Sequence, residues 1–232
     1  DGNITIGHQA GKALVLGSSN TVIGVNALLA CVGDDASNAG RYNVCIGRDT
    51  MGAANSDGHA DCEVDGNVAI GNGALYSGTM AGAVDLVGNV AIGAEAMDAT
   101  GTNPHTGTIA IGYQSLTALT SGAGNTAVGY QAGDDLTDGA HNTILGYQAG
   151  DTLLSGTSFN VIVGSGAMGG SSSSAGSDYN VAVGYRAMGT GARNNADNNV
   201  AVGRDALLAL TAGVSNVAIG SLALDAQTTG SN

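Results

Sequence analysis

A five-residue motif recurs twelve times along the chain: Asn, a β-branched residue, a small or apolar residue, an aliphatic residue and Gly. Successive motif glycines lie 17 to 24 residues apart, and only Thr108 replaces the leading Asn. A period of this length is the sequence signature of a solenoid, in which each unit buries its apolar surface against its neighbours. The motifs begin at residues 3, 20, 43, 67, 89, 108, 125, 142, 160, 180, 199 and 216.

The columns of the motif predict a short strand that is apolar on both faces. Positions two and four hold only Val, Ile, Leu or Thr, and alternation along a strand places both on one face. The third position points the other way and never carries a charge. Such a strand is expected to be enclosed on both sides. The third-position alanines to which we assign a structural role are Ala69, Ala91, Ala127, Ala182, Ala201 and Ala218.

The residues at the two ends of the strand also have structural roles. The leading Asn tolerates the left-handed backbone region, and its amide can form a ladder with the copies above and below. The closing Gly suits a bend that needs a positive φ or a close backbone approach. This structural role is assigned to Gly24, Gly47, Gly71, Gly93, Gly112, Gly129, Gly146, Gly164, Gly184, Gly203 and Gly220.

A second short strand is predicted after each motif glycine, where Ala usually comes three positions later and Leu, Met or Gly comes next. Two strands and a loop per repeat predict an all-β fold, a parallel β-solenoid of about twelve rungs forming one array over residues 1–232.

Extra residues lengthen the repeats between 24 and 108. Stacking is expected to gather these inserts in one lateral patch near the N-terminal end, which either contacts a receptor or consists of spacers without a binding role. The inserts are residues 31–41, 52–65, 77–87 and 100–107.

Two sequence stretches resemble repeats of known fibrous proteins. Residues 89–93 and 216–220, both NVAIG, resemble the head repeats of YadA-like trimeric autotransporter adhesins. Residues 125–133, NTAVGYQAG, are similar to repeats of phage tail-fibre proteins. The resemblance implies a left-handed parallel β-roll, a homotrimeric fibre segment, and cell adhesion or host attachment. It also implies an extracellular location, on a virion tail fibre or a bacterial cell surface.

The two apolar faces of the strand also favour an oligomer. One roll can enclose only one face, so the other face requires a partner surface. The small alanines of the third column suit the close approach of a partner backbone. Because each chain carries a net charge of −13, the acidic residues are expected to lie outward, where salt screens them.

The composition argues against several function classes. Lys12 is the only lysine, so the chain has no basic patch for nucleic acid. The uncharged stretches 13–33 and 106–133 are interrupted by Gly, Asn, Ser and Thr, so no membrane insertion is predicted. No cofactor motif and no Ser/His/Asp or Cys/His constellation stands out, so we predict no enzyme and no cofactor. The role of Cys31, Cys45 and Cys62 stays open.

Two residue clusters are candidate binding sites. One is an acidic segment that could bind Ca²⁺ or Zn²⁺, although its spacing matches no EF-hand loop and a solvated acidic loop is the alternative. The other is a tyrosine at the same position of three successive repeats, which could bind sugar rings or could cover the roll and stabilise neighbouring rungs. These residues are Asp57, His59, Asp61, Glu63 and Asp65 in the acidic segment, and Tyr113, Tyr130 and Tyr147 in the ladder.

The sequence therefore predicts a non-enzymatic structural and adhesive fibre segment that presents a binding face to a host-cell receptor or glycan. The alternative is a glycan-binding or glycan-cleaving fibre of the tailspike type, because carboxylates from separate rungs could converge on one sugar.

Overall fold

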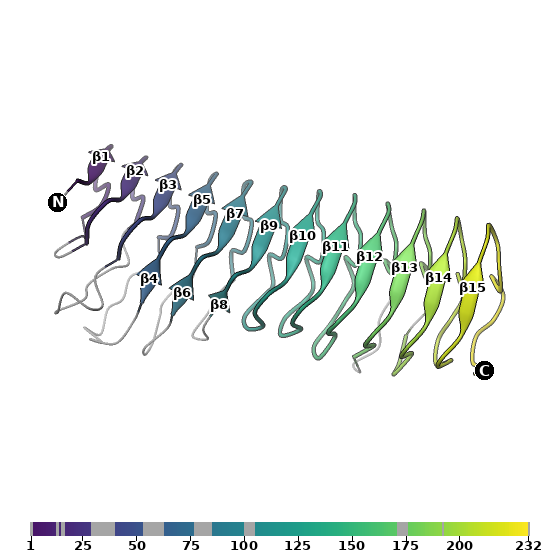
Figure 1. Ribbon diagram of the computed structural model, residues 1–232. Helices are drawn as coiled ribbons and strands as arrows, with labels where there is room; N and C mark the ends of the chain where they lie inside the picture. Colours follow the sequence, from purple (N-terminus) through teal and green to yellow (C-terminus); the bar gives the residue numbers. More distant parts are fainter. Residues whose placement is uncertain are drawn as a thin grey trace. The chain divides into compact units, whose positions relative to one another are not determined.

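The protein is an all-β parallel β-solenoid in which, within each of two units, successive repeats contribute one strand each to a parallel ladder (Figure 1). The computed structural model describes residues 2–12, 14, 17–28, 40–52, 63–76, 85–99, 105–170, 176–191 and 193–231. The chain divides into two compact units, Asp1–Gln114 (unit 1) and Ser115–Asn232 (unit 2).

Unit 1 contains two parallel sheets, of which the larger has the order β1-β2-β3-β5-β7-β9 and the smaller the order β4-β6-β8. The strands of the larger sheet are β1 (Ile4–Ile6), β2 (Thr21–Ile23), β3 (Val44–Ile46), β5 (Val68–Ile70), β7 (Val90–Ile92) and β9 (Ile109–Ile111). The strands of the smaller sheet are β4 (Val64–Asp65), β6 (Leu86–Val87) and β8 (His105–Thr106).

Unit 2 consists of six strands that pair in sequence order, each with the same motif residue opposite its equivalent in the next repeat. Ala127, for example, pairs with Ile144. The strands are β10 (Thr126–Val128), β11 (Thr143–Leu145), β12 (Val161–Val163), β13 (Val181–Val183), β14 (Val200–Val202) and β15 (Val217–Ile219). The parallel solenoid predicted from the repeat is confirmed.

The face of the strand that the roll encloses is the third-position face, so the assignment of faces made from the sequence is wrong. Ala127, Ala182 and Ala201 are 0% exposed within a single chain. Positions two and four instead point outward and are half-buried or exposed in every motif. The same enclosed face holds Val22, Cys45, Ile144 and Ile162 in other repeats, all 0% exposed, so the interior accepts large as well as small apolar residues.

The segment after each motif glycine forms turns among the described residues, so the second strand predicted there is wrong. In unit 2, Ala187 and Met188 are adjacent and both fully buried, which a strand with alternating faces does not allow. The turn achieves it through left-handed residues, with φ 51° at Arg186 and 53° at Met188. A left-handed non-glycine residue costs roughly 1–2 kcal/mol, and the buried side chain offsets this cost.

The turns are still joined from one repeat to the next by backbone hydrogen bonds. The N–H of Gln148 donates to the carbonyl of Tyr130 in the preceding repeat, at 2.9 Å. The N–H of Gly150 donates to the carbonyl of Ala167 in the following repeat, at 2.8 Å. Bonds therefore run in both directions along the stack, and each turn is fixed by both of its neighbours.

The motif glycine is required for two reasons. Gly129 has φ 146°, a conformation that side chains rarely adopt. A Cβ added at Gly129 would also overlap the carbonyl oxygen of Gly146 in the next repeat. The same close approach recurs from repeat to repeat, so the spacing between rungs depends on the absence of a side chain at this position.

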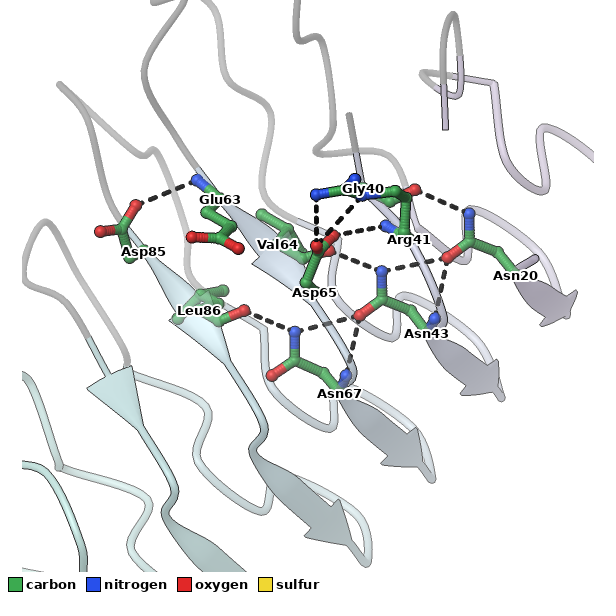
Figure 2. A network of polar contacts seen from close by, with 10 residues as sticks. All are labelled: Asn20, Gly40, Arg41, Asn43, Glu63, Val64, Asp65, Asn67, Asp85 and Leu86. Carbon is green, nitrogen blue, oxygen red and sulfur yellow. Dashed lines mark hydrogen bonds and ion pairs between the residues drawn. The ribbon is translucent and has the colours of Figure 1, made fainter. Parts of the chain in front are cut away.

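The leading asparagines form a buried amide ladder inside each unit. The Oδ1 atom of Asn125 accepts hydrogen bonds from the backbone N–H of Asn142 at 2.9 Å and from its Nδ2 at 3.0 Å. The same Nδ2 also donates to the Thr157 carbonyl at 2.8 Å. Each rung thus satisfies the polar groups of its neighbour, and Figure 2 shows this chain through Asn20, Asn43 and Asn67.

Thr108 interrupts this ladder in unit 1. Its N–H donates to Asn89 Oδ1 at 3.0 Å, but its buried hydroxyl has no partner among the described residues. Thr108→Asn should add the missing Nδ2 bond and remove the orphaned hydroxyl, raising the free energy of unfolding by about 1 kcal/mol. Urea denaturation followed by circular dichroism measures this change. The reverse substitution, Asn89→Thr, serves as the control and should lower stability; an unchanged or less stable Thr108→Asn protein would contradict the account.

Candidate binding surfaces

The bases of three inserts of unit 1 lie side by side in the small sheet β4-β6-β8 (Figure 1). Val64 pairs with Leu86, and Leu86 pairs with His105. The middle parts of these inserts, residues 53–62, 77–84 and 100–104, lie outside the described residues. The pairing of the strands therefore anchors three successive inserts to one common support.

An ion pair ties the first of these strands to the preceding repeat. Arg41 donates to Asp65 through Nη2 at 2.8 Å, through Nε at 3.1 Å and through its backbone N–H at 2.7 Å. One rung further, the Glu63 N–H donates to the Asp85 carboxylate at 3.0 Å. In Figure 2 these contacts lie directly beside the asparagine ladder. The polar groups at the base of the inserts therefore stabilise the frame.

The ion pair between Arg41 and Asp65 involves one of the five residues proposed from the sequence as a metal site in the acidic segment. Asp57, His59 and Asp61 lie outside the described residues. Of the other two, Asp65 accepts bonds from Arg41 on both oxygens. Within the described part of the chain, no group of three His, Cys, Asp or Glu side chains is arranged to hold a metal ion.

A shallow hollow of about 280 Å³ lies on unit 1 and was not predicted from the sequence. The residues two positions after successive motif glycines are Asp49, Gly73 and Glu95, so the middle repeat contributes no side chain to this column. A Cβ at Gly73 would meet nothing closer than 4.0 Å, which shows that the missing side chain leaves space. The lining residues are Asp49, Asn72, Gly73, Tyr76, Glu95 and Asp98.

The hollow is acidic and carries one aromatic ring. Desolvation by burial raises the pKa of Asp98, and the charge of Glu95 raises it further. Asp49 accepts a hydrogen bond from Asn26 at 2.9 Å, and Glu95 accepts one from Gln114 at 2.8 Å, so both carboxylates are held in place. Oriented acceptors beside a tyrosine suit a ligand with several hydroxyl groups.

The tyrosine ladder predicted from the sequence is present in unit 2 as a ring stack. The rings of Tyr130 and Tyr147 lie 5.2 Å apart between centroids with an interplanar angle of 10°. Tyr113 belongs to unit 1 and is 42% exposed. Because the stacked rings cover each other's faces, the stack offers mainly ring edges to solvent. This geometry favours a stabilising role over sugar stacking, which needs a free ring face.

A second aromatic stack in unit 2 was missed at the sequence level. His141 and Phe159 are stacked with centroids 5.2 Å apart, and Phe159 and Tyr179 follow at 5.1 Å with an interplanar angle of 4°. All three residues directly precede a motif Asn and have φ near 60°. Their shared position directly before the motif Asn could have predicted this stack from the sequence. The pattern was hard to see because Gly, Ser and Asn occupy the same position in other repeats.

Unit 2 also buries charged groups in its turn region. The guanidinium of Arg193 donates to the carbonyls of Met188 at 2.7 Å and Met168 at 2.6 Å. Burial lowers its pKa to about 10, and the nearby Asp151 carboxylate opposes this shift. These bonds satisfy carbonyl groups of two repeats, so Arg193 has a structural role.

The Asp134 carboxyl should make the stability of unit 2 depend on pH. Desolvation, followed by the charges of Asp135 and Asp151, raises its pKa from 3.8 to about 6. The folded state therefore holds the proton more tightly than the unfolded state, and this group lowers stability as pH rises from about 4 to 6. Asp134→Asn should match the original protein in stability at pH 4 and exceed it at pH 7, as measured by thermal denaturation. Equal stability of the two proteins at both pH values would rule out this effect.

Comparisons with protein-family models, curated proteins and solved structures find no significant match to the chain. The described residues include no helix long and apolar enough to cross a bilayer.

Proposed function

We propose that this chain is a non-enzymatic structural and adhesive segment of an extracellular fibre, belonging to a virion tail fibre or a bacterial surface adhesin. Three copies form a homotrimer of left-handed β-rolls, each with twelve rungs, and the inserts of unit 1 contact a host-cell receptor or glycan. The sequence resemblance supports the trimer and the location, and the outward strand face supports assembly.

The observation that carries this proposal is the apolar stripe outside the roll. Strand positions two and four hold only Val, Ile, Leu or Thr, and none of these side chains is fully buried in one chain. Val161, inside unit 2, is 40% exposed. A row of half-buried and exposed uncharged side chains along the strands of each unit, on a chain with net charge −13, is the kind of surface that marks a protein interface. The stripe itself is uncharged, so three copies can meet there while their acidic residues stay in solvent.

Light scattering on the isolated chain tests the assembly. The chain should have three times its monomer mass, and Val202→Asp should reduce it to a folded monomer because the new charge lies on the stripe. Asn198→Asp is the matched control, because it adds the same charge two residues before β14 and off the stripe. Asn198 is exposed and has φ 60°, a conformation that Asp tolerates. A stable folded monomer of the original chain at micromolar concentration would contradict the trimer.

The adhesive part of the proposal is tested by shortening the four inserts to the 17-residue repeat length and measuring binding to a glycan array. Binding should be lost while the circular dichroism spectrum stays unchanged. Retained binding by the folded, shortened chain would exclude the inserts as the contact surface.

The hollow on unit 1 favours a second candidate site for a glycan, since it combines fixed carboxylates with Tyr76. Tyr76→Ala should weaken binding to the same array, whereas Tyr42→Ala, which removes a ring that is 66% exposed and outside the hollow, should not. Equal effects of the two substitutions would argue against a specific site.

A further inference from the structure

The tyrosine stack of unit 2 stops at Tyr147, in the middle of the unit. Tyr130 and Tyr147 lie in successive repeats with an interplanar angle of 10°, so Tyr130 covers the face of Tyr147 that points to the preceding repeat. The opposite face points to the following repeat, where Ser165 occupies the same position after the motif glycine. Tyr147 is 54% exposed, compared with 43% for Tyr130. One face of the Tyr147 ring therefore has no ring against it.

A tyrosine returns in the same column one repeat after Ser165, at Tyr185, which is 52% exposed. These residues follow three successive strands, β11, β12 and β13 (Figure 1). The backbone stays in register across them. The Gly166 N–H donates to the Tyr147 carbonyl at 3.0 Å, and the next turn is joined in the same way, by a bond of 3.1 Å from the Arg186 N–H to the Ser165 carbonyl. Equivalent residues two repeats apart are separated by about 10 Å.

The repeat between the two tyrosines contributes only small side chains on this side. Ser165 is exposed, and Gly166 follows it. A Cβ added at Gly166 would meet a single atom within 4 Å, the Cγ of Arg186 at 3.4 Å, so the missing side chain leaves space. We call this gap the tyrosine slot, with Tyr147 and Tyr185 on its two sides and Ser165 and Gly166 at its base.

The tyrosine slot has the width for one ring. A ring placed midway would lie about 5 Å from each tyrosine, close to the 5.2 Å between the centroids of Tyr130 and Tyr147. The carbons of a sugar ring are tetrahedral and carry C–H groups on both faces, so a sugar is thicker than an aromatic ring and fills this width better. Its hydroxyl groups project from the ring edge, where water and the Ser165 hydroxyl can bond to them.

Basic groups adjoin the slot on the Tyr185 side. The guanidinium carbon of Arg186 lies 5.9 Å from the centroid of the Tyr185 ring. The Nε of Arg186 is 3.7 Å from Asp205 Oδ1, and the Nε of Arg204 is 3.4 Å from the other oxygen. One carboxylate thus serves two guanidinium groups, which leaves one positive charge in excess. The side chains of Arg186 and Arg204 are 39% and 59% exposed, so an anionic ligand can reach them.

We propose that the tyrosine slot of unit 2 binds an acidic sugar, a pyranose ring that carries a carboxylate. The ring lies between Tyr147 and Tyr185 with C–H groups against the free face of Tyr147, and its carboxylate pairs with Arg186. Aromatic walls with a few placed polar groups are typical of ligand sites. The slot is separate from the inserts and the hollow of unit 1, so it does not depend on whether those surfaces bind a receptor. None of its residues belongs to the outward stripe.

Filling the slot tests the proposal. Ser165→Tyr puts into the empty place the side chain that Tyr147 and Tyr185 carry in the same column. The probes are methyl glucuronide and methyl glucoside, which share one ring and differ in the carboxylate, and binding is measured by calorimetry and saturation-transfer NMR. The original chain should bind the glucuronide more tightly than the glucoside, and Ser165→Tyr should bind neither. Ser165→Ala is the matched control and should bind like the original chain.

A second substitution tests the role of the charge. Arg186→Gln is compatible with the backbone, since Gln148 has φ 49° in the same column and Arg186 has φ 51°. It should weaken glucuronide binding about fivefold, the effect of one partly exposed charge pair, and leave glucoside binding unchanged. Circular dichroism verifies the fold of each variant. Tyr185→Leu should also abolish binding, whereas Tyr179→Leu, at an exposed tyrosine outside the slot, should not.

Three results would overturn the proposal. The first is that the original chain binds neither sugar or binds both equally. The second is that the folded Ser165→Tyr or Tyr185→Leu protein binds the glucuronide as tightly as the original chain does. The third is that Arg186→Gln weakens the binding of both sugars to the same extent, because the carboxylate would then have no partner at Arg186.

Discussion

Ala127→Asp should strongly destabilise unit 2 at pH 7. The side chain is 0% exposed in a single chain and lies on the enclosed face of β10, opposite Ile144 of β11. Ala132 and Ala149 are also fully buried in this interior, so a carboxylate there would lose its hydration and the group would stay protonated. Keeping it protonated at pH 7, about three pH units above its usual pKa, costs roughly 4 kcal/mol. That is a large part of the 5–15 kcal/mol typical of a domain.

The neighbouring residue provides the matched control. Val128 follows Ala127 on the same strand but points outward and is half-buried. Val128→Asp should therefore keep the fold of the monomer and affect only assembly. Urea denaturation of both variants should show a large loss of stability for Ala127→Asp, reduced as pH falls toward 4. Equal stability of the two variants at pH 7 would mean that the third-position face is not the enclosed one.

Asn160→Leu should also destabilise unit 2 strongly. Asn160 donates to Asn142 Oδ1 at 3.0 Å and to the Ser177 carbonyl at 2.9 Å. Its own Oδ1 accepts from the Asn180 N–H at 2.8 Å and Nδ2 at 3.1 Å. Leucine leaves these buried groups without partners, and each orphaned group costs about 1–3 kcal/mol, so a loss of at least about 3 kcal/mol is expected.

The comparison for this substitution is Asn194→Leu, which changes an exposed asparagine outside the ladder. Its free energy of unfolding should stay within about 0.5 kcal/mol of that of the original chain. If both substitutions cost the same, the amide ladder contributes nothing beyond ordinary packing. Urea denaturation monitored by circular dichroism distinguishes the two cases.

The strands and the amide ladder could be predicted because their signals lie within one repeat. Alternation in NTAVG or NVAIG defines a three-residue strand, and an Asn that leads eleven of the twelve motifs implies stacked amides. Which face the roll encloses is a different kind of question. Alternation separates Ala127 from Thr126 and Val128, but both faces of the strand are uncharged, so the pattern does not say which face the roll encloses.

The turn region and the surfaces could not be derived in the same way. Ala187 and Met188 are adjacent apolar residues that both point inward. This is possible because the turn contains left-handed residues, Arg186 and Met188. The hollow on unit 1 depends on Gly73 standing between Asp49 and Glu95, which becomes visible only once the repeats are aligned in space. Such features depend on side chains from several neighbouring repeats and cannot be read from the sequence of one repeat.

The direction of the inter-rung hydrogen bonds has a mechanical consequence. Because these bonds join successive strands of each unit, tension along the stack pulls them straight apart, one rung at a time. In unit 1 the weakest link is at Thr108, which bonds to Asn89 through its N–H but has no amide donor. Each opened 17-residue repeat would release about 55–60 Å of chain. The stack would then lengthen in increments under load, which single-molecule pulling can measure directly, with Thr108→Asn raising the force of the first event.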